Sequence, residues 1–173
     1  KGGAFEITLI SPASAAQQQW AGELDGVCDR FVGWAPRVPR PRWVRAADLL
    51  DPLPVNVVAD RAPAALQAVA ASMSGGFDLA VFDFVHSAVL RPERLACASV
   101  CFTHNVEAEI FARHAVTAGN ALMRRIWASQ AAKMERFERD ALRRFTSVVA
   151  VSDRDARQFR ERYALSSVHA IPT

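Results

Sequence analysis

The chain carries short, almost wholly apolar segments that alternate with helix-forming stretches. The candidate strands are Glu6–Ile10, a segment around Arg30–Val32, Phe77–Phe84, Ala98–Thr103, Ser147–Val151 and Val168–Ile171. Strands that are apolar on both faces are typical of a parallel sheet that helices cover on both sides. Because strands and helices alternate along the chain, the sequence predicts an α/β fold with three layers, α/β/α, around a mainly parallel sheet.

Two of the helices between these strands have clear signals. Ala62–Ser72 is rich in alanine and has Pro63 in its first turn, where a missing N–H group costs nothing. Asn120–Phe145 has apolar residues at spacings near three and four, which predicts one long amphipathic helix. Its charged face mixes arginines with acids such as Glu138, so we expect that face to contact solvent.

Size and composition indicate a single globular domain over residues 1–173. Hydrophobic residues make up 51% of the chain and charged residues 23%, which disfavours a disordered chain, a coiled coil or a collagen-like repeat. No uncharged apolar run reaches the roughly 18 residues of a membrane-spanning helix, and no secretory signal is visible. We therefore expect a cytoplasmic protein.

The net charge of +3 and the pI near 9.1 are only mildly basic. This excess is consistent with a phosphate-bearing partner, with an acidic membrane surface, or with an ordinary solvated exterior. The three cysteines, Cys28, Cys97 and Cys101, are odd in number and lack the CxxC spacing of zinc sites, which disfavours disulfides and zinc. The sequence also contains no Gly-rich phosphate loop, HExxH, GxSxG or paired carboxylates, so a hydrolase or a nucleoside-triphosphate enzyme has little support.

Polar residues follow four of the predicted strands. These strand ends are Ser11-Pro12, Val85-His86-Ser87, His104-Asn105 and Ser152-Asp153. In parallel α/β sheets, ligands bind outside the carboxyl ends of the strands. The sequence therefore places the candidate site at these four ends.

From Phe77 onward, the order of these features resembles a known family. The matching segments are Phe77–Phe84, Phe102–Glu107, the long helix with Met134–Glu138, Val149–Asp155 and Ala170–Pro172. Together they resemble the N-terminal, acceptor-side domain of GT-B glycosyltransferases, and specifically of glycosyltransferase family 4. The first half of the chain fits more loosely, with Phe5–Ile10 similar to the second strand of that domain.

This resemblance implies a Rossmann-like domain that lacks its first strand, which would lie in about thirty further residues at the front. It also implies that a C-terminal, donor-binding domain follows Thr173, so that the chain is a fragment with little activity of its own. The expected reaction is a retaining transfer of a hexose-type sugar from a sugar nucleotide to a glycan, lipid or small-molecule acceptor. The resemblance implies a metal-independent reaction without a further cofactor.

Within this resemblance His104 is the expected catalytic residue, because the matching histidine reaches the donor sugar or its phosphates across the interdomain cleft. Without the resemblance, a histidine at a strand end is better explained as a cap of the next helix or as a partner in a local hydrogen bond. Asn105 is better explained as a helix cap than as a ligand. Glu107 could contact the acceptor, although a favourable interaction with the helix dipole is the simpler explanation.

Three more polar residues belong to the same candidate cleft. His86 and Ser87 could line the acceptor side, or could belong to a solvated loop. The hydroxyl of Ser152 could touch a ligand, but capping of the following helix would satisfy it fully, and Asp153 competes for the capping position.

A proline-rich segment carries four arginines and two tryptophans: Trp34, Arg37, Arg40, Arg42, Trp43 and Arg45. The charges and amphipathic rings could bind an anionic acceptor or a lipid headgroup at the inner face of the membrane, or the segment could simply be solvated. No recognition helix or stacking sheet for nucleic acid is visible. The expected partners are therefore a sugar nucleotide and a carbohydrate or lipid-linked acceptor, with peripheral membrane contact and no nucleic acid.

Two alternatives remain open from the sequence. A non-enzymatic α/β domain that binds a ligand or another protein would share the architecture, since fold does not fix function. A flavodoxin-like regulatory domain has less support, because neither an acidic cluster nor a flavin phosphate loop is found. A sheet without its first strand would expose an edge, which predicts homo-oligomers through that edge. These residues do not specify the donor nucleotide, the sugar or the acceptor.

Overall fold

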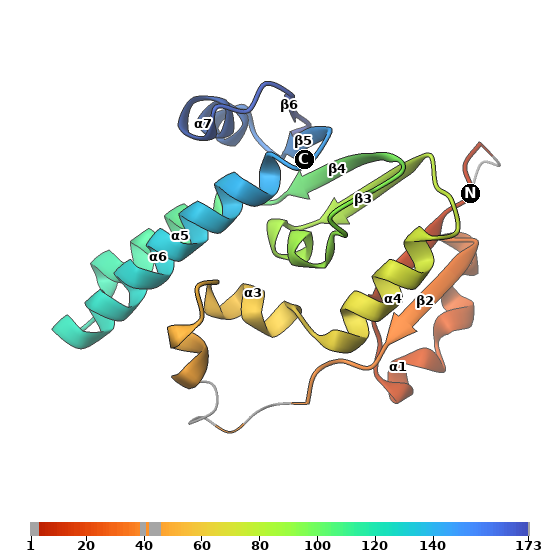
Figure 1. The fold of residues 1–173 in the computed structure, drawn as a ribbon, viewed down its shortest axis with the longest axis horizontal. Helices are drawn as coiled ribbons and strands as arrows, with labels where there is room; N and C mark the ends of the chain where they lie inside the picture. Colours follow the sequence, from red (N-terminus) through yellow and green to blue (C-terminus); the bar gives the residue numbers. More distant parts are fainter. Residues whose placement is uncertain (1–3, 39–40, 42–45, 173) are drawn as a thin grey trace.

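The computed structural model describes residues 4–38, 41 and 46–172 (Figure 1). Its strands are β1 (Thr8–Pro12), β2 (Arg30–Trp34), β3 (Leu79–Asp83), β4 (Ala98–Thr103), β5 (Ser147–Ala150) and β6 (Val168–Ala170). Its α-helices are α1 (Ala15–Gln18), α3 (Val55–Asp60), α4 (Pro63–Met73), α5 (Glu107–Thr117), α6 (Ala121–Leu142) and α7 (Asp153–Tyr163). Three 3-10 helices complete the described part: η1 (Ala21–Gly26), η2 (Asp48–Leu50) and η3 (Val85–Leu90).

The strands pair in parallel throughout the described residues. β1 and β2 form a two-stranded sheet, and β3, β4, β5 and β6 form a four-stranded sheet in that order. Helices fill the crossovers: α5 and α6, which run side by side in Figure 1, connect β4 to β5, and α7 connects β5 to β6. The predicted α/β class with mainly parallel strands is confirmed, and its character is Rossmann-like.

One face of the four-stranded sheet carries the main core. The residues of the sheet that point to this face are buried: Ala80, Phe82, Cys101, Val148, Ala150 and Val168. Residues of η3, α6 and α7 pack on them, among them Val85, Leu142 and Phe159. This face is apolar because helices exclude water from it, as the unbroken hydrophobic strands predict.

The opposite face of the same sheet is open. Leu79 and Val81 of β3 are 51% and 60% exposed, and Val100, Phe102 and Val149 on the neighbouring strands are half-buried. Right-handed crossovers that step in one direction place all their helices on one side of a sheet. The steps from β3 to β6 all run in one direction, so their helices share the buried face. Among the described residues, one of the two predicted helical layers is therefore seen over this sheet, and the other face is not covered by a helix.

Element boundaries follow the sequence signals closely in the second half. β4 has the predicted limits, and α6 begins directly after Asn120, whose side-chain oxygen accepts a hydrogen bond from the Met123 N–H (2.9 Å). Three elements were not predicted: η2, α3, and η3, which was expected to be a loop. The apolar residues Val85, Ala88 and Leu90 explain η3, because they bury themselves under the sheet on successive turns.

The prediction that the charged face of α6 contacts solvent is wrong at Glu138. This side chain is fully buried. Its carboxylate accepts hydrogen bonds from the N–H groups of Glu107 (2.9 Å) and Ala108 (3.4 Å) and from the hydroxyl of Tyr163 (2.7 Å). A buried charge is tolerated where donors replace the lost water, which is why an apparently solvent-facing acid turns inward here.

Candidate functional site

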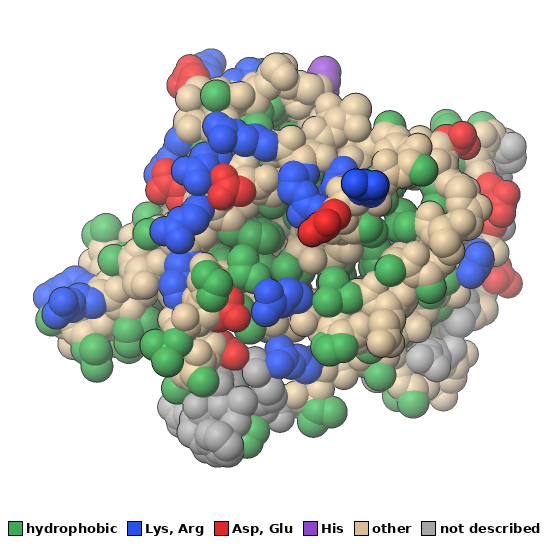
Figure 2. Space-filling model, viewed as in Figure 1, with side chains coloured by type: hydrophobic (Ala, Val, Ile, Leu, Met, Phe, Trp, Pro, Cys, Tyr) green, Lys and Arg blue, Asp and Glu red, His purple; other side chains and the backbone are tan. Residues whose placement is uncertain are grey.

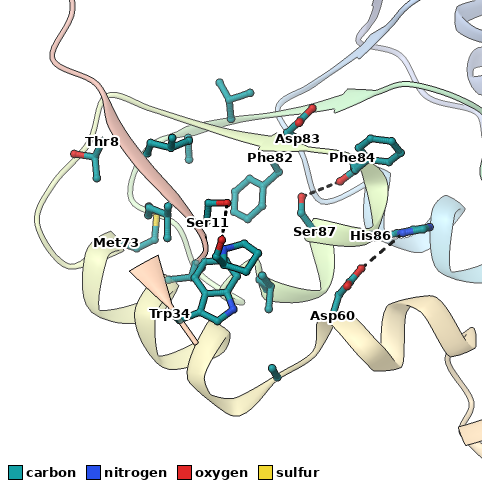
Figure 3. A pocket seen from close by; sticks show the side chains of 18 of the residues that line it. Thr8, Ser11, Trp34, Asp60, Met73, Phe82, Asp83, Phe84, His86 and Ser87 are labelled. Carbon is teal, nitrogen blue, oxygen red and sulfur yellow. Dashed lines mark hydrogen bonds and ion pairs between the residues drawn. The ribbon is translucent and has the colours of Figure 1, made fainter. Parts of the chain in front are cut away.

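The carboxyl ends of β3, β4 and β5 lie next to one another, because these strands are neighbours in one parallel sheet. This edge brings together residues that follow β3 and β4, namely Phe84, His86, His104 and Glu107. A cleft of about 760 Å³ opens between this sheet and the β1–β2 sheet, and His86, Ser87 and Asp83 line its carboxyl end (Figure 3). Figure 2, which has the same orientation as Figure 1, shows hydrophobic side chains gathered in the hollowed centre of the molecule.

His104, the predicted catalytic residue, directly follows β4 and its side chain is 36% exposed. Its Nε2 lies 2.7 Å from Oδ1 of Asp83, the last residue of β3. Its ring stacks on Phe84, with centroids 4.3 Å apart and planes 14° from parallel, and meets the edge of Phe102 at 4.9 Å. Three neighbours therefore fix both the position and the tilt of the imidazole.

The bond to Asp83 assigns the two nitrogens of His104 different roles. A carboxylate can only accept a hydrogen bond, so the proton is assigned to Nε2, which donates a hydrogen bond to Asp83. No hydrogen-bond partner for Nδ1 is found among the described residues. Nδ1 can accept from a hydroxyl when the ring is neutral, and it can donate to an anionic oxygen when the ring is protonated. The partly exposed ring thus presents one nitrogen for a ligand.

Phe84 holds an unusual backbone conformation beside this histidine. Its φ angle is 68° and its ψ angle 141°, a region that residues with a side chain rarely occupy. Its N–H donates to the carbonyl oxygen of Phe102 (2.8 Å), and its own carbonyl accepts from the hydroxyl of Ser87 (2.8 Å). Such strain costs about 1–3 kcal/mol and is concentrated at functional sites. Here it turns the chain sharply from β3 into η3 and sets the ring against His104.

His86 lies between two carboxylates, and its ring is 6.1 Å from that of Phe84 between centroids. Its Nδ1 is 3.7 Å from Asp60 Oδ2, a contact drawn in Figure 3, and its Nε2 is 3.5 Å from Glu107 Oε2. Nε2 is buried without a hydrogen-bond partner in the described part of the chain. Burial raises the pKa of Asp60, and the charge of His86 opposes that rise. This arrangement places both His86 and Glu107 at the site edge, with the Glu107 carboxylate turned toward His86 and mostly buried.

Glu138 performs the capping that the sequence assigned to Asn105. The residue before α5 is Val106, which makes no side-chain cap, and Asn105 is exposed. The Glu138 carboxylate instead accepts from the first two N–H groups of α5, 30 residues away in the chain. Burial raises its pKa to about 7, against the lowering effect of these donors, and burial also raises the pKa of Tyr163. The first turn of α5, the helix that follows His104, is thus capped by a buried side chain of α6 and not by a residue of the preceding loop.

The other predicted site residues have local structural roles. Ser152 accepts from the Asp155 N–H (3.1 Å) and caps α7, as the capping explanation predicts. Ser87 bonds to Phe84, and Arg37 donates to the carbonyl of Val58 (3.1 Å) at the rim of the cleft. The remaining three arginines of the predicted anion contact, Arg40, Arg42 and Arg45, lie outside the described residues.

Sequence reasoning missed three members of this edge: Asp60, Asp83 and Phe84. Asp83 ends the apolar run of β3, so the strand-end rule could have found it. Asp60 ends a short helix that carried no signal, and nothing in the sequence marks Phe84 for a positive φ angle.

Comparisons with known proteins identify no relative. No family model, curated protein or solved structure matches this chain. Within the described residues, no three His, Cys, Asp or Glu side chains gather as a metal ion would require. The described helices also include none with the length and apolar character needed to cross a membrane.

Proposed function

We propose that this chain forms the acceptor-side half of a retaining, sugar-nucleotide-dependent glycosyltransferase of the GT-B type, similar to family 4. The observation that carries the proposal is the placement of His104. Its ring is oriented by Asp83 and Phe84, is partly exposed, and stands at the sheet edge where parallel α/β domains bind ligands. The ordered sequence resemblance from Phe77 onward supports the same assignment.

In this proposal His104 acts on the donor from the acceptor side. During transfer, the bond between the anomeric carbon and the phosphate oxygen breaks, and a new bond forms from the acceptor hydroxyl oxygen to the same carbon. The acceptor proton leaves with the departing nucleotide diphosphate. Nδ1 of His104 would hold a sugar hydroxyl or a phosphate oxygen as charge develops, and the fixed ring would make that contact without reorganisation.

The partners and setting follow from the same proposal. The nucleotide would be bound mainly by a second domain, while the acceptor, a glycan, lipid or small molecule, would approach the edge lined by His86, Ser87 and Arg37. No cofactor besides the sugar nucleotide substrate is required. Transfer to a lipid-linked acceptor would take place in the cytoplasm at the inner face of the membrane.

The test uses the natural full-length polypeptide, with radiolabelled UDP-glucose, UDP-N-acetylglucosamine and GDP-mannose as donors and extracts of the source cells as acceptors. We expect transfer from one donor, and we expect His104→Ala to lower kcat by roughly 100-fold or more, the effect of removing one preorganised donor to developing charge. Asp83→Asn is expected to lower kcat by about tenfold, because a neutral amide holds the ring less firmly.

The matched control is His169→Ala, which removes an exposed histidine of β6. It is expected to leave kcat unchanged. If His104→Ala has full activity in a folded enzyme, the proposed role of His104 is wrong. If no donor is consumed at all, the non-enzymatic binding domain becomes the better explanation.

A further inference from the structure

The hairpin of α5 and α6 extends beyond the part of the protein that it packs against. At its base, Phe111 and Met134 are buried in one core cluster with Val57 of α3. None of the residues 112–129, which we call the hairpin tip, is buried. In Figure 1 the hairpin tip projects to the left edge of the molecule, away from both sheets. The end of α5 and the first turns of α6 therefore contribute no fully buried side chain to the core.

Apolar side chains of the hairpin tip are exposed to solvent. Val116, near the end of α5, is 81% exposed, and Leu122 and Met123, in the first turn of α6, are 68% and 38% exposed. A single exposed apolar residue is ordinary on a protein surface. Here three of them lie within a few residues of the same connection between two helices, so they belong to one end of the molecule. Removing this end from water is favourable, because it covers apolar area.

The hairpin tip carries positive charge and no acid. Its arginines, Arg113, Arg124 and Arg125, are exposed, and no aspartate or glutamate occurs in residues 110–134. Among the described residues, no ion pair includes any of these arginines. Figure 2 shows basic and hydrophobic side chains together at the left end of the molecule, without acidic ones. The hairpin tip is therefore complementary to a negatively charged surface.

An aromatic cluster and a helix cap hold the hairpin tip in shape. The ring of Trp127 lies 5.7 Å from that of Phe111 and 4.7 Å from that of His114, between centroids. These contacts join α6 to α5. Asn120 caps α6 by accepting a hydrogen bond from the Met123 N–H. The exposed apolar and basic groups are thus presented in a fixed arrangement, which lowers the entropy lost on binding.

The narrow form of the hairpin tip indicates which kind of partner fits. Each helix is about 10–12 Å across, so the end of the pair measures roughly 10 Å by 20 Å. A stable protein–protein interface covers about 800 Å² on each partner, far more than this end offers. A bilayer surface closes around a small convex group and accepts aliphatic side chains to a depth of about 5–10 Å. Anionic headgroups attract nearby arginines as well.

We propose that the hairpin tip inserts into the surface of a membrane that contains anionic lipids. Val116, Leu122 and Met123 lie at the boundary between headgroups and acyl chains, and the arginines of the hairpin tip contact lipid phosphates. This is a different surface from the proline-rich segment around Arg37, for which the sequence indicated a lipid headgroup contact. The inference does not rest on the proposed sugar transfer, since it concerns binding alone.

The experiment measures co-sedimentation of the natural full-length polypeptide with vesicles. One set contains phosphatidylcholine alone, and the other contains equal parts of phosphatidylcholine and phosphatidylglycerol. We expect binding to the anionic vesicles to be about tenfold tighter or more, and to weaken as salt is added. Arg124→Glu combined with Arg125→Glu should weaken binding to the anionic vesicles about tenfold or more. Leu122→Gln should weaken it about fivefold to tenfold, because less apolar area is covered.

The matched controls change exposed residues outside the hairpin tip. Arg136→Glu combined with Arg157→Glu makes the same change in net charge on α6 and α7, and Leu50→Gln removes a leucine of η2 that is 87% exposed. Both controls are expected to keep the affinity for anionic vesicles. Equal binding to both kinds of vesicle, or equal losses in the controls, would overturn the proposal. So would a dimer in sedimentation that Leu122→Gln dissociates, since a second copy would then cover the hairpin tip.

Discussion

Removal of the Tyr163 hydroxyl tests the buried carboxylate of Glu138. Tyr163→Phe deletes one oxygen atom and keeps the ring, which is buried and lies 5.9 Å from the ring of Phe159 between centroids. In the native protein the hydroxyl donates to Oε2 of Glu138 at 2.7 Å. The substitution therefore removes one hydrogen bond and leaves the surrounding apolar packing in place.

The expected loss depends on the charge of Glu138. A hydrogen bond to a charged group contributes about 1.5–3 kcal/mol to stability, and one between neutral groups about 1 kcal/mol. Burial raises the pKa of Glu138 to about 7, so the carboxyl is ionised at about pH 8 and protonated at about pH 5. We expect Tyr163→Phe to lower the free energy of unfolding by about 2 kcal/mol at the higher pH and about 1 kcal/mol at the lower.

Urea denaturation followed by far-UV circular dichroism at both pH values measures the two losses. Repeating it in a Glu138→Gln background completes a double-mutant cycle, in which the hydroxyl is expected to contribute about 1 kcal/mol less at the higher pH. Glu135→Gln is the control, because its carboxylate forms an exposed ion pair with Arg162 (2.8 Å) and is expected to cost less than about 1 kcal/mol. Equal losses at both pH values, or strict additivity with Glu138→Gln, would refute the charged buried acceptor.

Three other measurements address pH, thiol reactivity and backbone strain. Because the folded pKa of Glu138, about 7, lies above its ordinary value of 4.5, the stability from this carboxyl is fully present below pH 4.5 and is lost as the pH rises to about 7. Unfolding free energies should therefore fall by roughly 3 kcal/mol over that range, and Glu138→Gln should abolish the fall. Burial raises the pKa of the Cys101 thiol to about 12, so a maleimide should label the half-buried Cys97 first; peptide mass spectrometry that finds Cys101 labelled first contradicts this. Phe84→Gly should be more stable than Phe84→Ala by about 1–2 kcal/mol, since both lose the ring and only glycine relieves the φ angle of 68°; equal urea midpoints would count against strain.

Local signals predicted most of the fold. β4 and α6 were found with nearly correct limits, because an unbroken apolar run and a long periodic stretch with an Asn cap are encoded within a few neighbouring residues. Parallel pairing also followed from local pattern, since strands without polar alternation need cover on both faces. The split into two sheets did not follow, because it depends on which edges find a partner in three dimensions.

The position of the candidate site could be predicted from the sequence, but the contacts between its side chains could not. The strand-end rule brought His104, His86 and Ser87 to one edge, and this needs only strand positions and parallel pairing. The partner of His104 is Asp83, 21 residues earlier, and the partners of His86 are Asp60 and Glu107, which reach it from separate elements. Such contacts depend on tertiary packing, so composition and spacing could not reveal them.

The burial of Glu138 is a second case in which tertiary contacts overrule a local sequence pattern. The helical pattern of α6 predicts that an acid among arginines faces solvent. It contains no information on the hydrogen-bond donors that α5 and α7 supply. The buried Glu138 carboxylate caps α5 in place of Asn105, the residue that was expected to do so.

The shared carboxylate has an evolutionary consequence. Since Glu138 belongs to α6 and receives bonds from α5 and α7, loss of the tyrosine hydroxyl alone leaves a buried acid with too few donors, and loss of the acid alone strands the hydroxyl. Each single change is therefore costly, and an apolar side chain at position 138 would also leave the N–H groups of Glu107 and Ala108 without their acceptor. Among related sequences, we therefore expect the tyrosine at position 163 to occur together with an acceptor side chain at position 138, and an apolar residue at 138 to be rare.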